Sequence, residues 1–279
     1  MSYKTILVHL DTSVRAHPRL ETALQLARRF DAYVIGLFAV FEPSPHAFTV
    51  MAGSAEYYRE HAAVRREQRG AIERIFRAEL TRAGVSGEWI ETQEQPGFFV
   101  PRHAGRADLV IAGQSDPGDP ESYVGEHFPE TLVMASGRPV LLMPYAWFFA
   151  DVGKRPMIAW DGSREASRAV HDALPLLKAA EHVSIVSIRK ARDEMTGECV
   201  SGADIAASLA RHGVKADVFV SERAPDTSAG ELLLSRAADI EADLVVMGGY
   251  GHARWEERVL GGVTQTFLSS MTLPVLMSH

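Results

Sequence analysis

The sequence has a single cysteine, Cys199, among 279 residues. One thiol cannot form a disulfide within the chain, so a disulfide-stapled secreted domain is excluded. No apolar run approaches the roughly 20 residues that span a bilayer. The first segment, MSYKTILVHL, lacks the charged and apolar regions of a signal peptide. We therefore expect a cytoplasmic protein with no membrane span.

Positive charge is also scarce. Lys and Arg total 29 against 36 Asp and Glu, the net charge is -7, and the basic residues form no block. This balance offers no electrostatic surface for nucleic acid or anionic lipid. Hydrophobic residues make up 46% of the chain, enough for the cores of two domains. The expected partner is a small molecule or another protein.

Several motifs of known chemistry are missing. There is no Gly-x4-Gly-Lys-Ser/Thr, no His-Glu-x-x-His and no cysteine cluster, and the 11 histidines are scattered. P-loop nucleoside triphosphatases and the usual zinc sites are therefore not indicated. GQSDPG, which begins at Gly113, lacks the spacing of a nucleophile elbow. Because no pair of nucleophile and base can be named, we expect no catalytic residue and no metal site.

An internal repeat, in contrast, is plain. An apolar run ends in Asp-x-Ser at Asp11 and again at Asp161, ADLVIAG recurs as ADLVVMG, and PVLLM recurs as PVLM, all in the same order. Such self-similarity indicates two copies of one structural unit. We predict two domains, residues 1–147 and residues 148–279.

Short apolar runs alternate with amphipathic stretches in each half. The predicted strands are Ile6–Leu10, Val34–Phe41, Glu88–Thr92, Leu109–Ala112 and Val140–Met143, then Met157–Trp160, Val183–Ile188, Ala216–Val220, Leu244–Met247 and Val275–Met277. Apolar strands separated by helices predict an α/β class with a parallel sheet and helices on both faces. Ligands of such folds bind beyond the carboxyl ends of the strands, where Asp161 and Gly248 stand.

Two other stretches carry structural predictions. Residues 165–180 place Ala169, Ala173, Leu176 and Leu177 on one stripe and predict a single helix. The first half is longer because a turn-rich loop and a charged helix are inserted between residues 42 and 80. We interpret the insertion as a surface element and keep a lid as the alternative.

A glycine-rich loop follows the fourth predicted strand of the second half. Gly248 and Gly251 begin this loop, and Gly261 and Gly262 end it, just before a predicted helix. A loop that enters a helix presents unpaired N–H groups at the positive end of the helix dipole, which favours phosphate. Glycine can also take positive φ and lets the backbone approach a ligand. The spacing alone leaves open that these glycines serve only the turn and the helix start.

Other residues near the loop bear on the same site. Thr264 could add a hydroxyl, and His252 and Arg254 could add positive charge. Glu256 and Glu257 oppose an anion unless they face solvent or a bound Mg²⁺. The balance of these charges therefore depends on the fold.

Together these features resemble the universal stress protein family, and the chain is similar to a tandem member with two such domains. Nucleotide-binding members carry Gly-x2-Gly-x9-Gly, then Ser or Thr, after the fourth strand. Gly248, Gly251 and Gly261 have this spacing. The resemblance covers nearly the whole chain. It implies two tandem Rossmann-like (adenine nucleotide alpha hydrolase-like) domains, each with a five-stranded parallel sheet, and a role in stress response or signalling.

The resemblance also implies a ligand and a site. Asp161 and Ile188 would contact adenine, and the glycine loop with Val263 would hold the ribose and phosphates of ATP or ADP, with or without Mg²⁺. The residues expected to bind this nucleotide are Asp161, Ser163, Ile188, Gly248, Gly251, His252, Arg254, Gly261, Gly262, Val263 and Thr264. Gly262 departs from the family, since Ser or Thr would stand there, and the lost hydrogen bond costs about 1–3 kcal/mol. Thr264 is a candidate replacement.

The first half departs further from the family's motif. It keeps Gly113, but Asp116, Glu126 and His127 stand where the second half has glycines. Two carboxylates at the phosphate position repel a triphosphate, so we predict that this half binds none. Asp11 and Ser13 could still line a pocket for another ligand. In both halves, capping of the next helix is an alternative role for the aspartate of Asp-x-Ser.

Two classes of function stay open. The first is a stress or signalling protein that binds an adenine nucleotide and hydrolyses ATP slowly at most. The alternative is a non-nucleotide interaction protein whose pockets are degenerate or hold another metabolite or a lipid. Because the fifth strand of each repeat would be an apolar sheet edge, we expect the partner repeat to bury it. The resemblance implies that this burial is a pairing of Val140–Met143 with Val275–Met277 within the chain, since single-domain relatives commonly dimerise through this edge. A homodimer is a further option.

Overall fold

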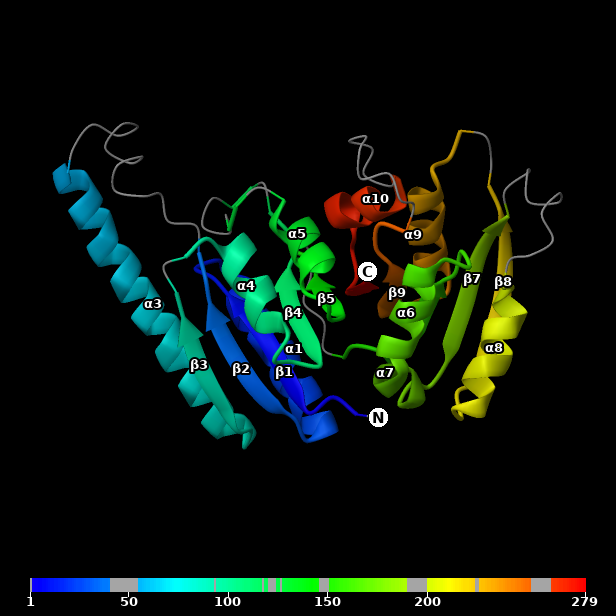
Figure 1. The fold of residues 1–279 in the computed structure, drawn as a ribbon, viewed down its shortest axis with the longest axis horizontal. Coiled ribbons are helices and arrows are strands. Elements are labelled where there is room, and N and C mark those ends of the chain that lie inside the picture. The colour runs from blue at the N-terminus through cyan, green and yellow to red at the C-terminus, as the bar shows by residue number, and fades with distance from the viewer. Residues whose placement is uncertain are drawn as a thin grey trace.

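The strands in the described part of the chain form one continuous sheet. A computed structural model describes residues 2–40, 55–92, 94–116, 118–119, 124–125, 127–145, 151–189, 200–223, 226–251 and 262–279. Within these ranges the sheet has ten strands in the order β3-β2-β1-β4-β5-β10-β9-β6-β7-β8, flanked by helices (Figure 1). The predicted α/β class is confirmed.

The strands match those expected from the apolar runs. Their bounds are β1 Thr5–Leu10, β2 Tyr33–Phe38, β3 Gly87–Glu91, β4 Leu109–Gly113, β5 Val140–Met143, β6 Pro156–Ala159, β7 Val183–Arg189, β8 Ala216–Glu222, β9 Leu244–Gly248 and β10 Val275–Ser278. The ends differ from prediction by at most two residues except at β2, which stops at Phe38. Phe41, where β2 was predicted to end, lies outside the described residues.

The two halves of the sheet repeat one topology. β1 pairs in parallel with β2 and β4, and β6 pairs in parallel with β7 and β9. The pairing of Ile6 with Leu109 recurs as the pairing of Pro156 with Leu244. The sequence repeat is therefore also a repeat of strand register.

The halves meet where β5 pairs antiparallel with β10. Leu142, Leu141 and Val140 lie opposite Val275, Leu276 and Met277, and all of these side chains are buried. This is the pairing expected from the sequence. It covers two apolar strand edges that would otherwise be open to association with other chains.

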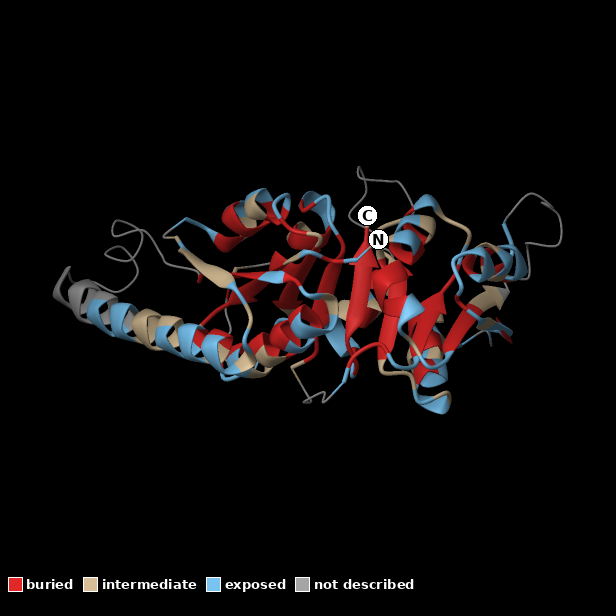
Figure 2. Ribbon diagram, turned by 90° about the horizontal axis from the view of Figure 1, so that it is seen from below, coloured by how far each residue is buried: buried red, intermediate tan, exposed pale blue. Residues whose placement is uncertain are grey.

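Helices cover both faces of the sheet. Their bounds are α1 Ala16–Phe30, α3 Ala55–Ala83, α4 Pro96–Ala104, α5 Phe128–Ala135, α6 Arg164–Asp172, α7 Leu174–Lys178, α8 Gly202–Arg211, α9 Ala229–Asp239 and α10 Gly262–Ser270. One apolar core lies under α1, α3, α6, α7 and α8, and the other lies under α4, α5, α9 and α10. Buried strands fill the middle of the molecule and exposed residues mark the outer sides of the helices (Figure 2). None of the described helices is both long and apolar enough to cross a membrane.

The prediction of a single helix over residues 165–180 is wrong. The structure divides it at Ala173 into α6 and α7, and Pro175 stands in the first turn of α7. Proline lacks the N–H that would continue the earlier helix, and its ring crowds the preceding turn. All four residues of the predicted stripe are nevertheless buried. The apolar pattern was therefore informative about the buried face but not about the break.

The inserted helix α3 lies at the β3 end of the sheet (Figure 1). Phe76 and Leu80 near its C-terminal end are buried, and a Cβ at Gly36 would collide with the Phe76 ring. Much of the rest of α3 is exposed or partly exposed (Figure 2). This position agrees with the interpretation of the helix as a surface element. The loop that precedes α3, residues 41–54, lies outside the described residues.

Candidate functional site

A cavity of about 340 Å³ lies at the carboxyl ends of β6, β7 and β9. Sites for small ligands typically occupy about 300–1,000 Å³. The residues that line the cavity are Ala159, Trp160, Asp161, Val186, Ile188, Arg223, Ala229, Leu233, Met247, Gly248, Tyr250, Gly251, Gly262, Val263 and Thr264.

Many of the residues expected to bind a ligand meet in this cavity. Asp161, Ile188, Gly248, Gly251, Gly262, Val263 and Thr264 all line it. Ser163 lies next to it at the start of α6. The other three expected residues, His252, Arg254 and Gly261, lie outside the described residues, as do Glu256 and Glu257.

Apolar side chains form much of the cavity wall. Val186 and Ile188 stand two residues apart on β7 and therefore point to the same face of the sheet. Met247 from β9 and Leu233 from α9 complete this wall. Sequence analysis missed these residues because each belongs to an ordinary apolar run. Because every second side chain of a strand points to the same face, the prediction for Ile188 could have been extended to Val186. The sequence around Leu233 contains no signal that this residue lines the cavity.

The polar end of the cavity is built around the Asp-x-Ser turn. The Oδ1 atom of Asp161 accepts a hydrogen bond from the backbone N of Ser163 at 3.0 Å. Ser163 Oγ accepts from the backbone N of Ala166 at 3.1 Å and is the N-cap of α6. The capping role considered for the aspartate thus belongs to the serine. Asp161 shapes the turn while its carboxylate stays exposed on the cavity wall.

Two glycines of the loop are explained by close packing against α6. A Cβ on Gly248 would lie 2.5 Å from the backbone N of Ala166, and a Cβ on Gly251 would lie 3.0 Å from Glu165 Oε2. Neither glycine has a positive φ, which in this loop belongs to Tyr250 instead. Close approach, rather than a left-handed backbone, is therefore the reason for glycine at both positions. For Gly248 this packing requires glycine even without a ligand.

The start of the loop also lies beside a buried carboxylate. Glu165 is 5% exposed, and its Oε1 accepts a hydrogen bond from Nε of its neighbour Arg164. Sequence analysis did not single it out, because a glutamate in the first turn of a helix usually serves the helix dipole. The Arg164 guanidinium, with its nearest nitrogen 2.7 Å from Glu165 Oε1, offsets this negative charge next to Gly251.

At the other end of the loop, Thr264 holds the backbone in place. Its Oγ1 accepts a hydrogen bond from the backbone N of Tyr250 at 3.3 Å, and the side chain is buried. The hydroxyl hydrogen remains available for a ligand, since a threonine both donates and accepts. Gly262 has open space around it as far as the described residues go, because a Cβ there would meet none of their atoms within 4 Å. The Ser or Thr expected at this position from the family that the sequence resembles would therefore fit.

This half of the chain matches a family model. Residues 154–279 match the model described as the universal stress protein family. The chain therefore carries a universal stress protein domain. For residues 154–279 this confirms the family expected from the sequence. A search of the curated proteins finds no match.

Solved structures share the fold of the whole chain. A universal stress protein from Archaeoglobus fulgidus DSM 4304 matches with a TM-score of 0.66 at 16% identity, over 98% of this chain and 97% of that chain. A functionally unknown protein from Pseudomonas aeruginosa PAO1 matches with a TM-score of 0.65 at 14% identity, over 99% of this chain and 92% of that chain. These likenesses show that the fold extends over both halves.

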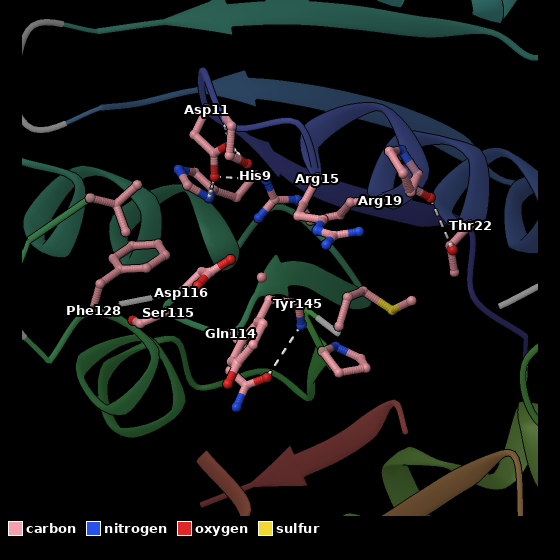
Figure 3. Close-up of a pocket in the computed structure, with 16 residues that line it drawn as sticks. His9, Asp11, Arg15, Arg19, Thr22, Gln114, Ser115, Asp116, Phe128 and Tyr145 are labelled. Atoms are coloured by element: carbon pink, nitrogen blue, oxygen red, sulfur yellow. Dashed lines mark hydrogen bonds and ion pairs between the residues drawn. The ribbon is translucent and has the colours of Figure 1, made fainter. Parts of the chain in front are cut away.

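The corresponding place in the first half is almost filled. Its cavity has a volume of about 30 Å³ and is lined by residues such as His9, Asp11, Arg19 and Phe128 (Figure 3). His9 pairs with Leu37 of β2 as Ala159 pairs with Val186 of β7, so His9 stands where the universal stress protein domain has Ala159.

Two rings fill the space of the first-half site. Phe128 follows Gly113 at the spacing at which Val263 follows Gly248. The His9 and Phe128 rings are both buried, with centroids 4.8 Å apart, and His9 Nε2 forms a hydrogen bond of 2.7 Å with the backbone O of Ala39. Larger side chains at two matched positions thus occupy volume that is open in the second half.

A buried ion pair completes the filling. Arg19 donates to Asp11 Oδ2 at 2.7 Å, and Ser13 donates to Asp11 Oδ1 from both its backbone N and its hydroxyl. The Arg19 side chain also occupies the space that a Cβ on Gly113 would need. Figure 3 shows Asp11 and His9 together on this wall.

Burial sets the protonation of this cluster. It lowers the pKa of His9 to about 4, so the imidazole is neutral near pH 7. Burial also raises the pKa of Asp11, but the Arg19 charge and the hydrogen bonds from Ser13 and Arg19 lower it below its ordinary value. Asp11 and Arg19 therefore form a charged pair beside a neutral histidine.

The structural reason for a closed first half differs from the one suggested by sequence. Of the two carboxylates expected to repel phosphate, Glu126 lies outside the described residues, and Asp116 accepts a hydrogen bond from the backbone N of Gly118. The packed rings and the Asp11–Arg19 pair reduce the cavity of the first half to about 30 Å³ whatever the charge at Asp116. Within the described residues, no group of three or more His, Cys, Asp or Glu could hold a metal ion.

Proposed function

We propose that the chain binds an adenine nucleotide, ATP or ADP, in the cavity of its second half, and that it serves as a cytoplasmic stress-response or signalling protein. The observation that carries this proposal is the 340 Å³ cavity, which is lined at once by Asp161, Ile188 and both described ends of the glycine loop. On this proposal the chain divides into residues 1–147, which support the fold, and residues 148–279, which hold the ligand.

The parts of the cavity suit the parts of a nucleotide. Apolar side chains such as Val186 and Met247 offer surface to a flat base, and the Asp161 carboxylate can accept a hydrogen bond from an amino or hydroxyl group. Gly251 and Gly262 keep backbone N–H groups accessible to phosphate oxygens. Mg²⁺ would be held mainly by the phosphates and water, as is usual for this ion.

Calorimetric titration of the full chain with ATP, ADP and adenosine, with and without Mg²⁺, tests the proposal. We expect saturable binding that weakens strongly in Gly251→Val, because the added side chain meets Glu165 and Ser163 and displaces the loop. Gly105→Val is the matched control, since a Cβ at this position would meet no atom within 4 Å. No detectable binding by the parent chain at millimolar nucleotide would exclude this function.

An apolar metabolite or a lipid is the second candidate ligand. The predominantly apolar wall favours it, and so do the missing hydroxyl at Gly262 and the buried Glu165 carboxylate beside Gly251. Mass spectrometry of the ligand that co-purifies with the protein separates the two candidates. Adenine nucleotide in the denatured sample supports the first, and a fatty acid or another apolar molecule supports the second.

A further inference from the structure

A buried glutamine of the first half reaches a helix of the second half. Gln114 follows β4 and is 6% exposed. Its Nε2 donates to the backbone O of Leu268 in α10 at 2.9 Å, and its Oε1 accepts from the backbone N of Tyr145 at 3.3 Å. Both ends of the amide are thus engaged, one within each half of the chain.

This contact gives a hydrogen-bond donor to a carbonyl in the last turn of α10, the helix whose first turn lines the ligand cavity. α10 begins at Gly262, and Val263 and Thr264 in its first turn line the cavity. Leu268 lies in the last turn, where backbone carbonyls lack partners within the helix. A helix of this length is stiff along its axis, at about 1.5 Å per residue. Fixing the last turn therefore also orients the first turn at the cavity.

The first half also packs against the start of the glycine loop. A Cβ on Gly249 would lie 2.9 Å from Cγ1 of Val133 in α5, so α5 approaches this backbone closely. The backbone N of Gly249 donates to the backbone O of Ser278 at 2.9 Å, which ties the loop to β10 beside the seam. The start of the loop and the last turn of the helix that follows it therefore both rest on contacts at the boundary between the halves.

We infer that Gln114 is a positioning residue for the ligand cavity of the second half. By holding the last turn of α10, the first half keeps Val263 and Thr264 in place for the ligand. The inference rests on the proposed nucleotide binding. Because coupling between two sites is reciprocal, a bound nucleotide also strengthens the contact between Gln114 and α10.

Titration of full-length variants tests this role. Gln114→Leu removes both hydrogen bonds, and Gln114→Glu keeps an acceptor for Tyr145 but loses the donor to Leu268. We expect both variants to raise the Kd for ATP or ADP about three- to tenfold, the size of effect that one hydrogen bond supports. Hydrogen exchange should be faster in α10 of both variants and slower in α10 of the parent chain once nucleotide is bound.

Arg29→Ala is the matched control. Arg29 in α1 donates to the backbone O atoms of Val152 and Ala179, so it also links the halves, but at the amino ends of the strands, opposite the cavity. Its loss should lower the thermal midpoint without changing the Kd. If the parent binds nucleotide and the Gln114 variants bind equally well, or if Arg29→Ala weakens binding as much, the inference is wrong. If the parent binds no nucleotide, the proposed function and this inference fall together.

Discussion

Introducing two ring side chains of the first half at the matched positions of the second half should close the second-half cavity. Ala159→His and Val263→Phe, made together, introduce into the second half the two residues that fill the first. The matched positions enclose about 340 Å³ around Ala159 and Val263 and about 30 Å³ around His9 and Phe128. The double variant should therefore lose most of the space available to a base.

The expected effect on binding is large. A ligand held at micromolar Kd has a binding free energy of about -8 kcal/mol, and one held at millimolar Kd has about -4 kcal/mol. Blocking the base site should move the Kd beyond the millimolar range, a loss of about 4 kcal/mol or more from a micromolar site. Overpacking costs the folded state about 1–3 kcal/mol. Most of the added volume enters a cavity, so the cost to stability should lie at the low end.

Calorimetry with ATP and ADP, together with urea unfolding, measures both effects. The control is Ala179→His, which adds the same side chain at an exposed position outside the cavity. It should leave the Kd unchanged. Nucleotide binding by the double variant within threefold of the parent would refute the argument that these two positions decide which half is open.

Other predictions concern single positions. Gly262→Ser should tighten nucleotide binding up to about tenfold in calorimetry, because its side chain has open space and adds one hydrogen bond; weaker binding would contradict this. Arg19→Ala should lower the unfolding free energy by about 3–5 kcal/mol in urea, since it leaves Asp11 buried without its cation; a loss below 1 kcal/mol would contradict this. Because the pKa of His9 is lowered to about 4 in the folded chain, the unfolded chain gains the proton first, and stability should fall by about 3 kcal/mol between pH 6.5 and pH 4. His9→Gln should reduce that slope in urea titrations at several pH values, and an unchanged slope would contradict the assignment.

The secondary structure of this protein could largely be predicted from its sequence. Short apolar runs such as Leu109–Gly113 became buried strands, because burial on both faces of a parallel sheet requires apolar residues at every position. That the fifth strands would be buried followed from their exposed apolar edges, and the resemblance to the family implied their pairing as β5 with β10. The break between α6 and α7 was missed, although Pro175 was a local signal for it.

The candidate site was only partly predictable. Asp161 and the glycines belong to local motifs, so their spacing was visible along the chain. Whether each cavity is open or filled was not visible along the chain, because it depends on whether side chains distant in sequence meet. His9 contacts Phe128 because parallel strands bring the ends of separate segments to one edge of the sheet. Gln114 reaches Leu268 because the antiparallel pairing of β5 with β10 brings the two halves together. The sequence by itself determined the repeated strands and the motif residues, whereas the tertiary structure decided that one cavity is filled and the other open, since packed volume belongs to no single segment of the chain.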